Sequence, residues 1–481
     1  MESFLPAGCY WRLTRGEIPL SLLSTQALSE NDDIRASHGP SSGLMRVGRS
    51  CKEETPISSP AKHIGIAATP LRGEQSIREA VLLLFCDPLP QQCLRLEALS
   101  LKQWMHLLRW LDFSGLALYF LDRIVELGRK DLLPVPVLTL LQQRLSDNTK
   151  RTDGMTAESI AIQEEFQNSR LSYAILKGLS LWPSSVPRPG LRSQFDLDFL
   201  VGEECAPEAR TILECRGYRL YAISGNSWEF KRNEIPGLSL KDMYKDLQSW
   251  TVELHVEPAL SRPHSPLERL AWRDICGYTM PTLCAIDLFT GQGLHTYKHI
   301  CGEFLRAAHL VEFRRHVLFR REDNKFWSRL YHSACENRRI SVGLGIATLL
   351  ITQVTSEFAP DEFTRWTVRS LPASAHLWCQ RYGYRVVLGS FPGSKLYLLL
   401  QRELDNQEIP LRRSIRQSLL PSRLPPPVIR AFPNETLSIR FRRYRMHFNF
   451  IVQRLRFHLV EGLRFTRELR QWRRNLKHLA R

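Results

Sequence analysis

The chain lacks several features that define common protein classes. None of its eleven cysteines forms a C-x-x-C pair, which leaves zinc-ribbon and thioredoxin-type sites without support. An odd number of scattered cysteines is typical of reduced thiols in a cytoplasmic protein. No apolar run approaches the ~20 residues that cross a bilayer, and the N-terminus has no apolar core of a secretion signal. We therefore expect a cytoplasmic protein without a transmembrane segment.

Acidic residues are scarce at the C-terminal end, where most of the net charge of +17 resides. From Arg440 to Arg481 there are thirteen Lys and Arg but two Glu, a local charge of +11. The rest of the 481-residue chain is only mildly basic. This distribution disfavours a nucleic-acid binder that is positive over its whole surface.

Apolar residues recur at near-helical spacing in this tail, with arginines between them. The pattern predicts a basic amphipathic helix over 436–481. Three interpretations stay open: a helix that packs on the body with a solvated basic face, a helix that docks peripherally on an anionic membrane, and a contact with RNA. The apolar positions are Leu455, Leu459, Leu463, Leu469, Trp472, Leu476 and Leu479.

The rest of the sequence changes from helical to β-type patterning and back. Ser76 and Glu79 form a capping-box pattern that predicts a helix start, and helices are expected within 99–127, at 135–145 and at 155–169. Helical patterning returns from Pro266 to about Gln401. Between these regions the predicted elements are strands at Tyr173–Leu176, Phe195–Val201, Tyr218–Ala222 and Trp250–Val256, and a helix at Pro207–Cys215.

These elements predict an α/β (α+β) fold, in which a small mixed-sheet core is flanked by N- and C-terminal helical regions. The predicted units are a poorly ordered N-terminal extension at 1–75, a helical region at 76–170, the α/β core at 171–265, a helical domain at 266–405, a Pro-rich linker at 406–435 and the basic tail at 436–481.

Asp196 and Asp198 stand one residue apart inside an apolar, strand-like run. Because side chains alternate along a strand, both carboxylates point to the same face and can share one or two hard divalent cations. An isolated pair of this kind is more often an exposed polar face. Upstream, the Lys177-Gly178 turn suits a phosphate, since glycine lets backbone N–H groups approach closely.

A second alternating strand places Glu253 and His255 on one face. Three carboxylates from two strands, beside a glycine turn, form the set that two-metal phosphoryl transfer requires. Mg²⁺ (or Mn²⁺) suits such a site, because it prefers a few carboxylates together with phosphate oxygens. The residues therefore indicate metal-assisted chemistry on a nucleotide.

Taken together, these motifs resemble the uncharacterised nucleotidyltransferases of the DNA polymerase beta-type nucleotidyltransferase superfamily. The resemblance is carried by Leu176-Lys177-Gly178, by Arg192-x3-Asp196-Leu-Asp198 and by Val252-Glu253-Leu-His255, and it covers about 171–317 with His295-x3-His299 and Arg306-x5-Glu312. Two positions depart from the usual pattern. Where the superfamily usually has Gly-Ser, this chain has Lys177-Gly178, as the narrower group also does. At the end of Arg306-x5-Glu312, where the family usually has Asp, this chain has Glu312.

The resemblance implies an enzyme that moves a nucleoside monophosphate from an NTP, ATP favoured, to a hydroxyl acceptor and releases pyrophosphate. Asp196, Asp198 and Glu253 would be the catalytic and metal-binding acids, with Glu253 also orienting or deprotonating the acceptor hydroxyl. The acceptor itself is not specified by the residues, although the resembling group favours a sugar-linked one. The nucleotide-binding candidates are Lys177, Gly178, Arg192, His299 and Arg306, and the further candidates are His255, His295 and Glu312.

Other interpretations remain. A D-x-D strand also occurs in metal-dependent glycosyltransferases that use nucleotide-sugars, although these do not need the Lys-Gly turn or the Glu253 strand. A third interpretation is a non-catalytic nucleotide-binding scaffold, although the presence of all three acids argues against a decayed site. His295 and His299 have zinc-ligand spacing on a predicted helix, but no H-E-x-x-H motif or cysteine ligand accompanies them, so a polar helix face is the favoured interpretation.

Overall fold

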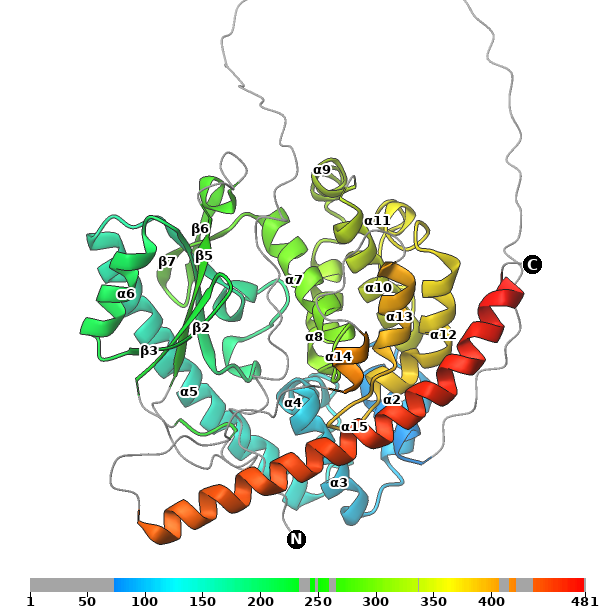
Figure 1. The fold of residues 1–481 in the computed structure, drawn as a ribbon. Coiled ribbons are helices and arrows are strands. Elements are labelled where there is room, and N and C mark those ends of the chain that lie inside the picture. Colours follow the sequence, from blue (N-terminus) through cyan, green and yellow to red (C-terminus); the bar gives the residue numbers. More distant parts are fainter. Residues whose placement is uncertain are drawn as a thin grey trace, which may run out of the picture.

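The computed structural model describes residues 73–232, 243–246, 250–258, 265–335, 337–405, 415–420 and 436–479. Seven strands form one mixed sheet, and helices flank it (Figure 1). The predicted α/β (α+β) fold with flanking helical regions is confirmed. Nearly all of the predicted extension at 1–75 and most of the predicted linker at 406–435 lie outside the described residues. Within the described residues, every helix falls short of the combined length and apolarity that crossing a bilayer requires.

The sheet has the strand order β3-β4-β5-β2-β1-β7-β6. At its centre β2 and β5 run parallel, and β1 pairs antiparallel with β2. All four predicted strands are confirmed to within two residues, whereas β4, β6 and β7 were not predicted. The bounds are β1 Tyr173–Leu176, β2 Asp196–Gly202, β3 Arg219–Ser224, β4 Ser227–Lys231, β5 Thr251–Glu257, β6 Leu270–Ile275 and β7 Tyr278–Leu283.

Side chains of β2 alternate between two apolar cores. Leu197 and Phe199 pack in a core shared with two helices, α5 (Val135–Asn168) and α6 (Ala206–Cys215). Leu200 belongs instead to the larger core, which continues into the helical regions. Asp196 and Asp198 are four and two residues before Leu200, so their side chains lie on the same face of the strand as Leu200. The two acids therefore face the side of the larger core.

The N-terminal helical region differs from its prediction in two places. Helix α2 begins at Glu74, so Ser76 lies inside the helix, and the capping box is formed by Ser100 and Gln103 at the start of α3. The helices predicted at 135–145 and 155–169 are one 34-residue helix, α5. The polar stretch between them continues the helix because its buried side chains have partners, as the bond from Asn148 Nδ2 to the Gly190 carbonyl shows. The other helices here are α2 Glu74–Leu83, η2 Gln91–Leu96, α3 Leu101–Ser114, α4 Ala117–Glu126 and η3 Lys130–Leu132.

Helical structure does not resume at Pro266 as predicted. Apart from the short η8 (Pro266–Glu268), β6 and β7 come first and form an antiparallel hairpin at the sheet edge. Their turn was missed because one of its two left-handed residues is Cys276 (φ 57°), next to Gly277 (φ 80°). The predicted helical region at 266–405 therefore contributes two strands to the sheet before its first α-helix.

From Ala285 onward the described residues are helical. The long last helix crosses the outside of the molecule, drawn orange to red in Figure 1. The bounds are α7 Ala285–Ile300, α8 Ala307–Phe319, α9 Asn324–Ala334, α10 Arg338–Val354, α11 Asp361–Trp366, α12 Ala373–Val387, α13 Tyr397–Asp405, α14 Ile415–Leu419 and α15 Leu437–Leu479, and the short helices that follow β1 are η4 Gly178–Leu181 and η5 Pro189–Leu191.

Candidate active site

The parallel pairing of β2 and β5 brings two of the predicted acids together. Asp198 is in register with Glu253, and residues in register on neighbouring strands point to the same face of the sheet. Asp198, Glu253 and His255 each offer a ligand atom within 4.8 Å of the others. The structure thus places three predicted residues in one cluster that could hold a metal ion.

Asp198 is the most constrained member of this acidic cluster. Its Oδ1 lies 2.7 Å from Lys177 Nζ and 2.9 Å from His255 Nε2. Burial alone would raise the pKa of Asp198, but Lys177 and His255 outweigh it and hold this pKa well below its usual range. Asp198 is therefore a carboxylate at any physiological pH.

Asp196 lies beside the cluster and behaves differently. Burial, followed by the negative charge of Asp198, raises the pKa of Asp196 to about 7. Like charges at close range cannot both ionise freely. The two acids of the D-x-D pair therefore have widely separated pKa values, and the positive charge of a cation between them would lower the pKa of Asp196 again.

Lys177 reaches Asp198 from a strained turn at the end of β1. Lys177 has φ 48° and Gly178 has φ 37°, so two consecutive residues are left-handed. A Cβ on Gly178 would lie 2.7 Å from Gln194 Oε1, so that side chain would have to move, and the positive φ of Gly178 also disfavours any residue that has a side chain. Burial lowers the pKa of Lys177, but Asp198, Glu253 and Asp196 together raise it above its usual value, so the ammonium keeps its charge.

Arg192 is held by a buried acid from the helical region. Its Nε lies 3.2 Å from Oε1 of Glu312 on α8, and the same oxygen accepts a 2.7 Å hydrogen bond from the Tyr119 hydroxyl. Asn148 Nδ2 donates to the Arg192 carbonyl at 3.2 Å. Glu312 therefore acts as the anchor of the Arg192 guanidinium.

His295 and His299 meet a third imidazole that sequence reasoning missed. His309, on α8, completes a cluster whose ligand atoms lie within 4.8 Å of one another. Ring centroids are 4.6 Å apart for His295 and His299 and 4.3 Å apart for His299 and His309. Burial lowers the pKa of all three, with that of His299 at about 3, so the rings are neutral.

His309 supplies the third ligand that a zinc site at His295 and His299 lacked in the sequence. The positive charge around the three rings, however, argues against a bound dication. The positive groups that act on His299 are Lys298, Arg306, Lys177 and Arg192, in decreasing order. Although Lys177 and Arg192 are paired with Asp198 and Glu312, these positive groups disfavour a further dication beside the neutral rings. Arg306 is itself buried and has no hydrogen-bond partner for its Nε among the described residues.

Two other residues of the site were also missed. Glu229 on β4 is in register with Glu253 and is buried, so a further acid shares this face of the sheet. Ser227 donates a hydrogen bond to Glu253. The alternation of Ser227-Trp-Glu229-Phe-Lys231 is a period-two signal that could have predicted β4 and both residues. For α8 the corresponding local signal is the three-residue spacing of Arg306, His309 and Glu312, which places them on one side of a helix.

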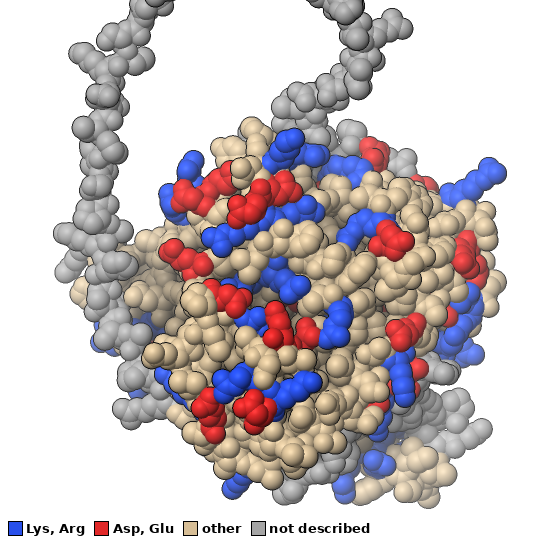
Figure 2. All heavy atoms as spheres, turned by 180° about the vertical axis from the view of Figure 1, so that it is seen from behind, with Lys and Arg blue, Asp and Glu red and all other residues tan. Residues whose placement is uncertain are grey.

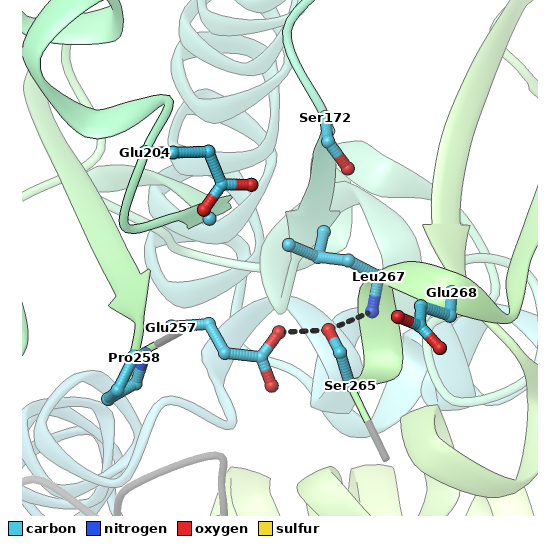
Figure 3. A pocket seen from close by; sticks show the side chains of 8 residues that line it. Ser172, Glu204, Glu257, Pro258, Ser265, Leu267 and Glu268 are labelled. Carbon is cyan, nitrogen blue, oxygen red and sulfur yellow. Dashed lines mark hydrogen bonds between the residues drawn. The ribbon is translucent and has the colours of Figure 1, made fainter. Parts of the chain in front are cut away.

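A small pocket opens at the other end of the same strands (Figure 3). It is lined by Gly202 and Glu257, the last residues of β2 and β5, together with Glu204 and Ser265. Glu257 accepts a hydrogen bond from Ser265, and burial raises the pKa of this carboxyl. Glu257 is four residues beyond Glu253 along β5, about 13 Å away. This pocket is therefore separate from the acidic cluster.

Comparison with known proteins identifies the family. A family model described as uncharacterised nucleotidyltransferase matches residues 100–355, which is more than half of the chain. The chain belongs to this nucleotidyltransferase family. The resemblance inferred from the motifs is thereby confirmed, and the match reaches further than the motifs, from α3 to α10.

Curated proteins and solved structures give two further comparisons for this member of the family. A search of curated proteins finds no match. Among solved structures, an antigenic nucleotidyltransferase-like protein from Paracoccidioides brasiliensis is similar at 15% identity, with a TM-score of 0.25, over 38% of this chain and 87% of that chain.

Proposed function

We propose that this protein transfers a nucleoside monophosphate from an NTP, with ATP favoured, to a hydroxyl acceptor. The hydroxyl oxygen forms a bond to the α-phosphorus and loses its proton, the bond from the α-phosphorus to the β-phosphate oxygen breaks, and pyrophosphate leaves. The observation that supports this proposal best is the register of Asp198 with Glu253 beside the Lys177 ammonium. A sugar-linked acceptor in the cytoplasm is our working assignment.

The acidic residues fit a divalent cation. Asp196, Asp198 and Glu253 supply carboxylate oxygens, the donors that Mg²⁺ and Mn²⁺ prefer. When bound, the metal ions neutralise charge that develops on the phosphoryl oxygens and favour ionisation of the attacking hydroxyl. We assign His255 to orienting Asp198, because its Nε2 contacts that carboxylate at 2.9 Å and a hard cation prefers oxygen.

The cations of the site fit the remaining charge of the nucleotide. Lys177 would contact the triphosphate as a point charge, and Arg192 would contact it through its planar fork. Gly178 keeps the turn backbone open to a phosphate oxygen. His299 and Arg306 would face the nucleotide from the helical region, and the buried Nε of Arg306 has no acceptor among the described residues. Bound phosphate would satisfy that group.

Glu253 is placed to act on the acceptor. Ser227 donates to one carboxylate oxygen, and His255 Nε2 lies 3.7 Å from the other. The hydrogen bond from Ser227 restricts the orientation of this carboxylate, and a residue that orients a hydroxyl requires such restriction. Glu253 would therefore hold or remove the acceptor proton as the new bond forms.

The direct test is incubation of the full chain with α-labelled NTPs, Mg²⁺ and a cell extract, followed by identification of the labelled fraction. We expect label on an acceptor together with pyrophosphate release. Asp196→Ala and Asp198→Ala should abolish the transfer, while Glu322→Ala, whose side chain is 94% exposed, should leave it unchanged.

Other outcomes would replace the proposal. Release of a nucleoside diphosphate would indicate a glycosyltransferase. Metal-dependent binding of the NTP without transfer to any fraction would indicate a nucleotide-binding scaffold. Full activity of purified Asp198→Ala would remove the assignment of the acidic cluster.

A further inference from the structure

The last helix, α15, has two apolar faces on opposite sides. One face packs on the body of the protein through Phe450, Phe457, Phe465 and Trp472, which are all buried. Trp472 anchors it by donating a 3.1 Å hydrogen bond from Nε1 to Oε1 of Glu403. Near the middle of the helix, Arg454 also pairs with Glu303 at 2.9 Å. These contacts explain why one apolar face is present.

The second face points away from the body. Its members recur at helical spacings of seven, four, three, four and four residues and are between 46% and 70% exposed; they are Phe441, Phe448, Val452, Leu455, Leu459 and Leu463. At 3.6 residues per turn the centre of this exposed stripe lies about 160° from the centre of the buried face. Packing on the body therefore cannot account for the exposed stripe.

The exposed stripe is a concentrated feature of the surface. Of the 22 large hydrophobic residues that are exposed in the described part of the chain, ten lie between Leu437 and Leu463. Single exposed apolar residues are common and need no explanation, whereas a contiguous patch marks a contact surface. The predicted tail pattern mixed two sets of residues, because Leu455, Leu459 and Leu463 belong to the exposed stripe while Leu469, Trp472, Leu476 and Leu479 pack on the core.

Positive charge borders the exposed stripe. Arg442, Arg445 and Arg456 are exposed and lie on one side of it, about 40–100° from its centre. Within α15 the two acidic residues face the body, where Glu461 accepts from the Lys395 N–H and Glu468 from the Tyr382 hydroxyl. By contrast, on the face of the molecule drawn in Figure 2, Lys and Arg alternate with Asp and Glu. The outward side of α15 is thus both apolar and cationic.

We propose that the exposed stripe of α15 docks on an anionic lipid bilayer, with the helix lying flat on the surface. From Leu437 to Leu463 the helix is about 40 Å long, and its Phe, Leu and Val side chains would enter the acyl boundary. The bordering arginines would reach lipid phosphates, as long cationic side chains do at interfaces. Because arginines are costly inside the bilayer, we expect the helix to lie on the membrane surface and not to cross it.

Two alternative occupants fit the observations less well. RNA offers phosphates to the arginines but has nothing to cover aliphatic Val452, Leu455, Leu459 and Leu463. A second copy of this chain would cover the stripe but would bring two arginine edges together, and like charges at an interface oppose association. An anionic bilayer satisfies both the apolar and the charged part. This inference is independent of the proposed nucleotidyl transfer.

The test is co-sedimentation of the full chain with vesicles of phosphatidylcholine alone or with phosphatidylserine added. We expect binding to the anionic vesicles that weakens at high salt, and weak binding to the neutral ones. Leu455→Glu/Leu459→Glu should lower the partition coefficient at least tenfold. The matched control is Ile223→Glu/Trp272→Glu, which adds the same charge at residues 56% and 61% exposed on the sheet and should bind like the unchanged chain.

A second variant separates lost docking from lost folding. Arg442→Gln/Arg445→Gln/Arg456→Gln keeps the stripe and should lose the preference for anionic vesicles. Thermal unfolding of all variants should match that of the unchanged chain, since every substituted residue is exposed. Failure of the unchanged chain to bind anionic vesicles, or equal binding by the stripe variant, would overturn the proposal. So would a dimer in light scattering that only the stripe variant disrupts.

Discussion

The ammonium of Lys177 lies 2.7 Å from Oδ1 of Asp198, so a positive charge already occupies one side of the carboxylate that the proposed chemistry needs for a cation. The same lysine is assigned to the triphosphate. Both roles are compatible if the incoming nucleotide draws the ammonium toward its phosphates and frees Asp198.

Replacement of Lys177 tests this exchange. Without NTP, Lys177→Ala should bind Mn²⁺ several-fold more tightly than the unchanged protein, because a competing positive charge is gone. With NTP, transfer should fall by about 10²-fold, the usual effect of losing one electrostatic contact in a reaction centre. Titration by Mn²⁺ electron paramagnetic resonance and the labelled-NTP assay measure the two effects. The control is Lys150→Ala, an exposed lysine on α5.

The raised pKa of Asp196 predicts a pH-dependent stability. Burial and the charge of Asp198 raise this pKa to about 7 from a usual 3.8, so the folded protein keeps a proton that the unfolded chain has lost. The contribution of this group to stability is full below about pH 4 and is lost as the pH rises through about 7.

Asp196→Asn removes the buried charge and should therefore raise the melting temperature of the metal-free protein at pH 8. The gain should shrink at pH 5, where the unchanged Asp196 is already protonated. Each kcal/mol corresponds to roughly 1 °C in a chain of this length, because the entropy of unfolding grows with the number of residues. Scanning calorimetry with EDTA at both pH values measures the difference, with Glu322→Gln as the exposed control. A gain that is the same at both pH values would contradict the raised pKa.

The predictable part of the site is the part that local pattern encodes. Period-two alternation places Asp196, Asp198 and Glu253 on shared faces, and the sheet does bring Asp198 and Glu253 into register. The partner of Arg192 could not be derived in this way, since Glu312 is 120 residues away and meets it only through packing of α8. His309 does have a local signal in its spacing from Arg306 and Glu312, but its contact with His295 and His299 depends on the packing of α8 against α7. The limit is therefore the packing of helices against the sheet.

The edge of the sheet shows a second limit. The apolar residues of β6 and β7 fit the helical period of 3.6 as well as the strand period of 2, because each stretch is short. The turn between them is signalled by Gly277 alone. Two polar residues in the middle of α5, Asn148 and Arg151, likewise look like a loop until their buried carbonyl partners are known. In both places, hydrogen bonds to distant parts of the chain or to a paired strand determine whether the segment is helix, strand or loop.

The anchor of Arg192 predicts a separation of binding from chemistry. Glu312→Gln leaves a buried guanidinium without its counter-charge, which should cost about 3 kcal/mol of stability. Because a displaced Arg192 cannot hold the triphosphate, KM for the NTP should rise more than kcat falls. Tyr119→Phe removes one hydrogen bond to the same oxygen and should give a smaller change in the same direction. Steady-state kinetics on both variants would reveal a purely structural role if kcat and KM stayed unchanged.

The two faces of α15 predict opposite results from two substitutions on one helix. Trp472 is fully buried and bonded to Glu403, so Trp472→Ala should cost about 3–5 kcal/mol by leaving a cavity. Leu459 is 66% exposed, so Leu459→Ala should change stability by less than about 0.5 kcal/mol. Limited proteolysis should then cut the C-terminal half of α15 in the first variant and spare it in the second. Because the exposed stripe does not include Trp472, the first variant should still pellet with anionic vesicles while the body unfolds more easily. Equal protease resistance of the two variants would show that the buried face does not hold α15 on the protein.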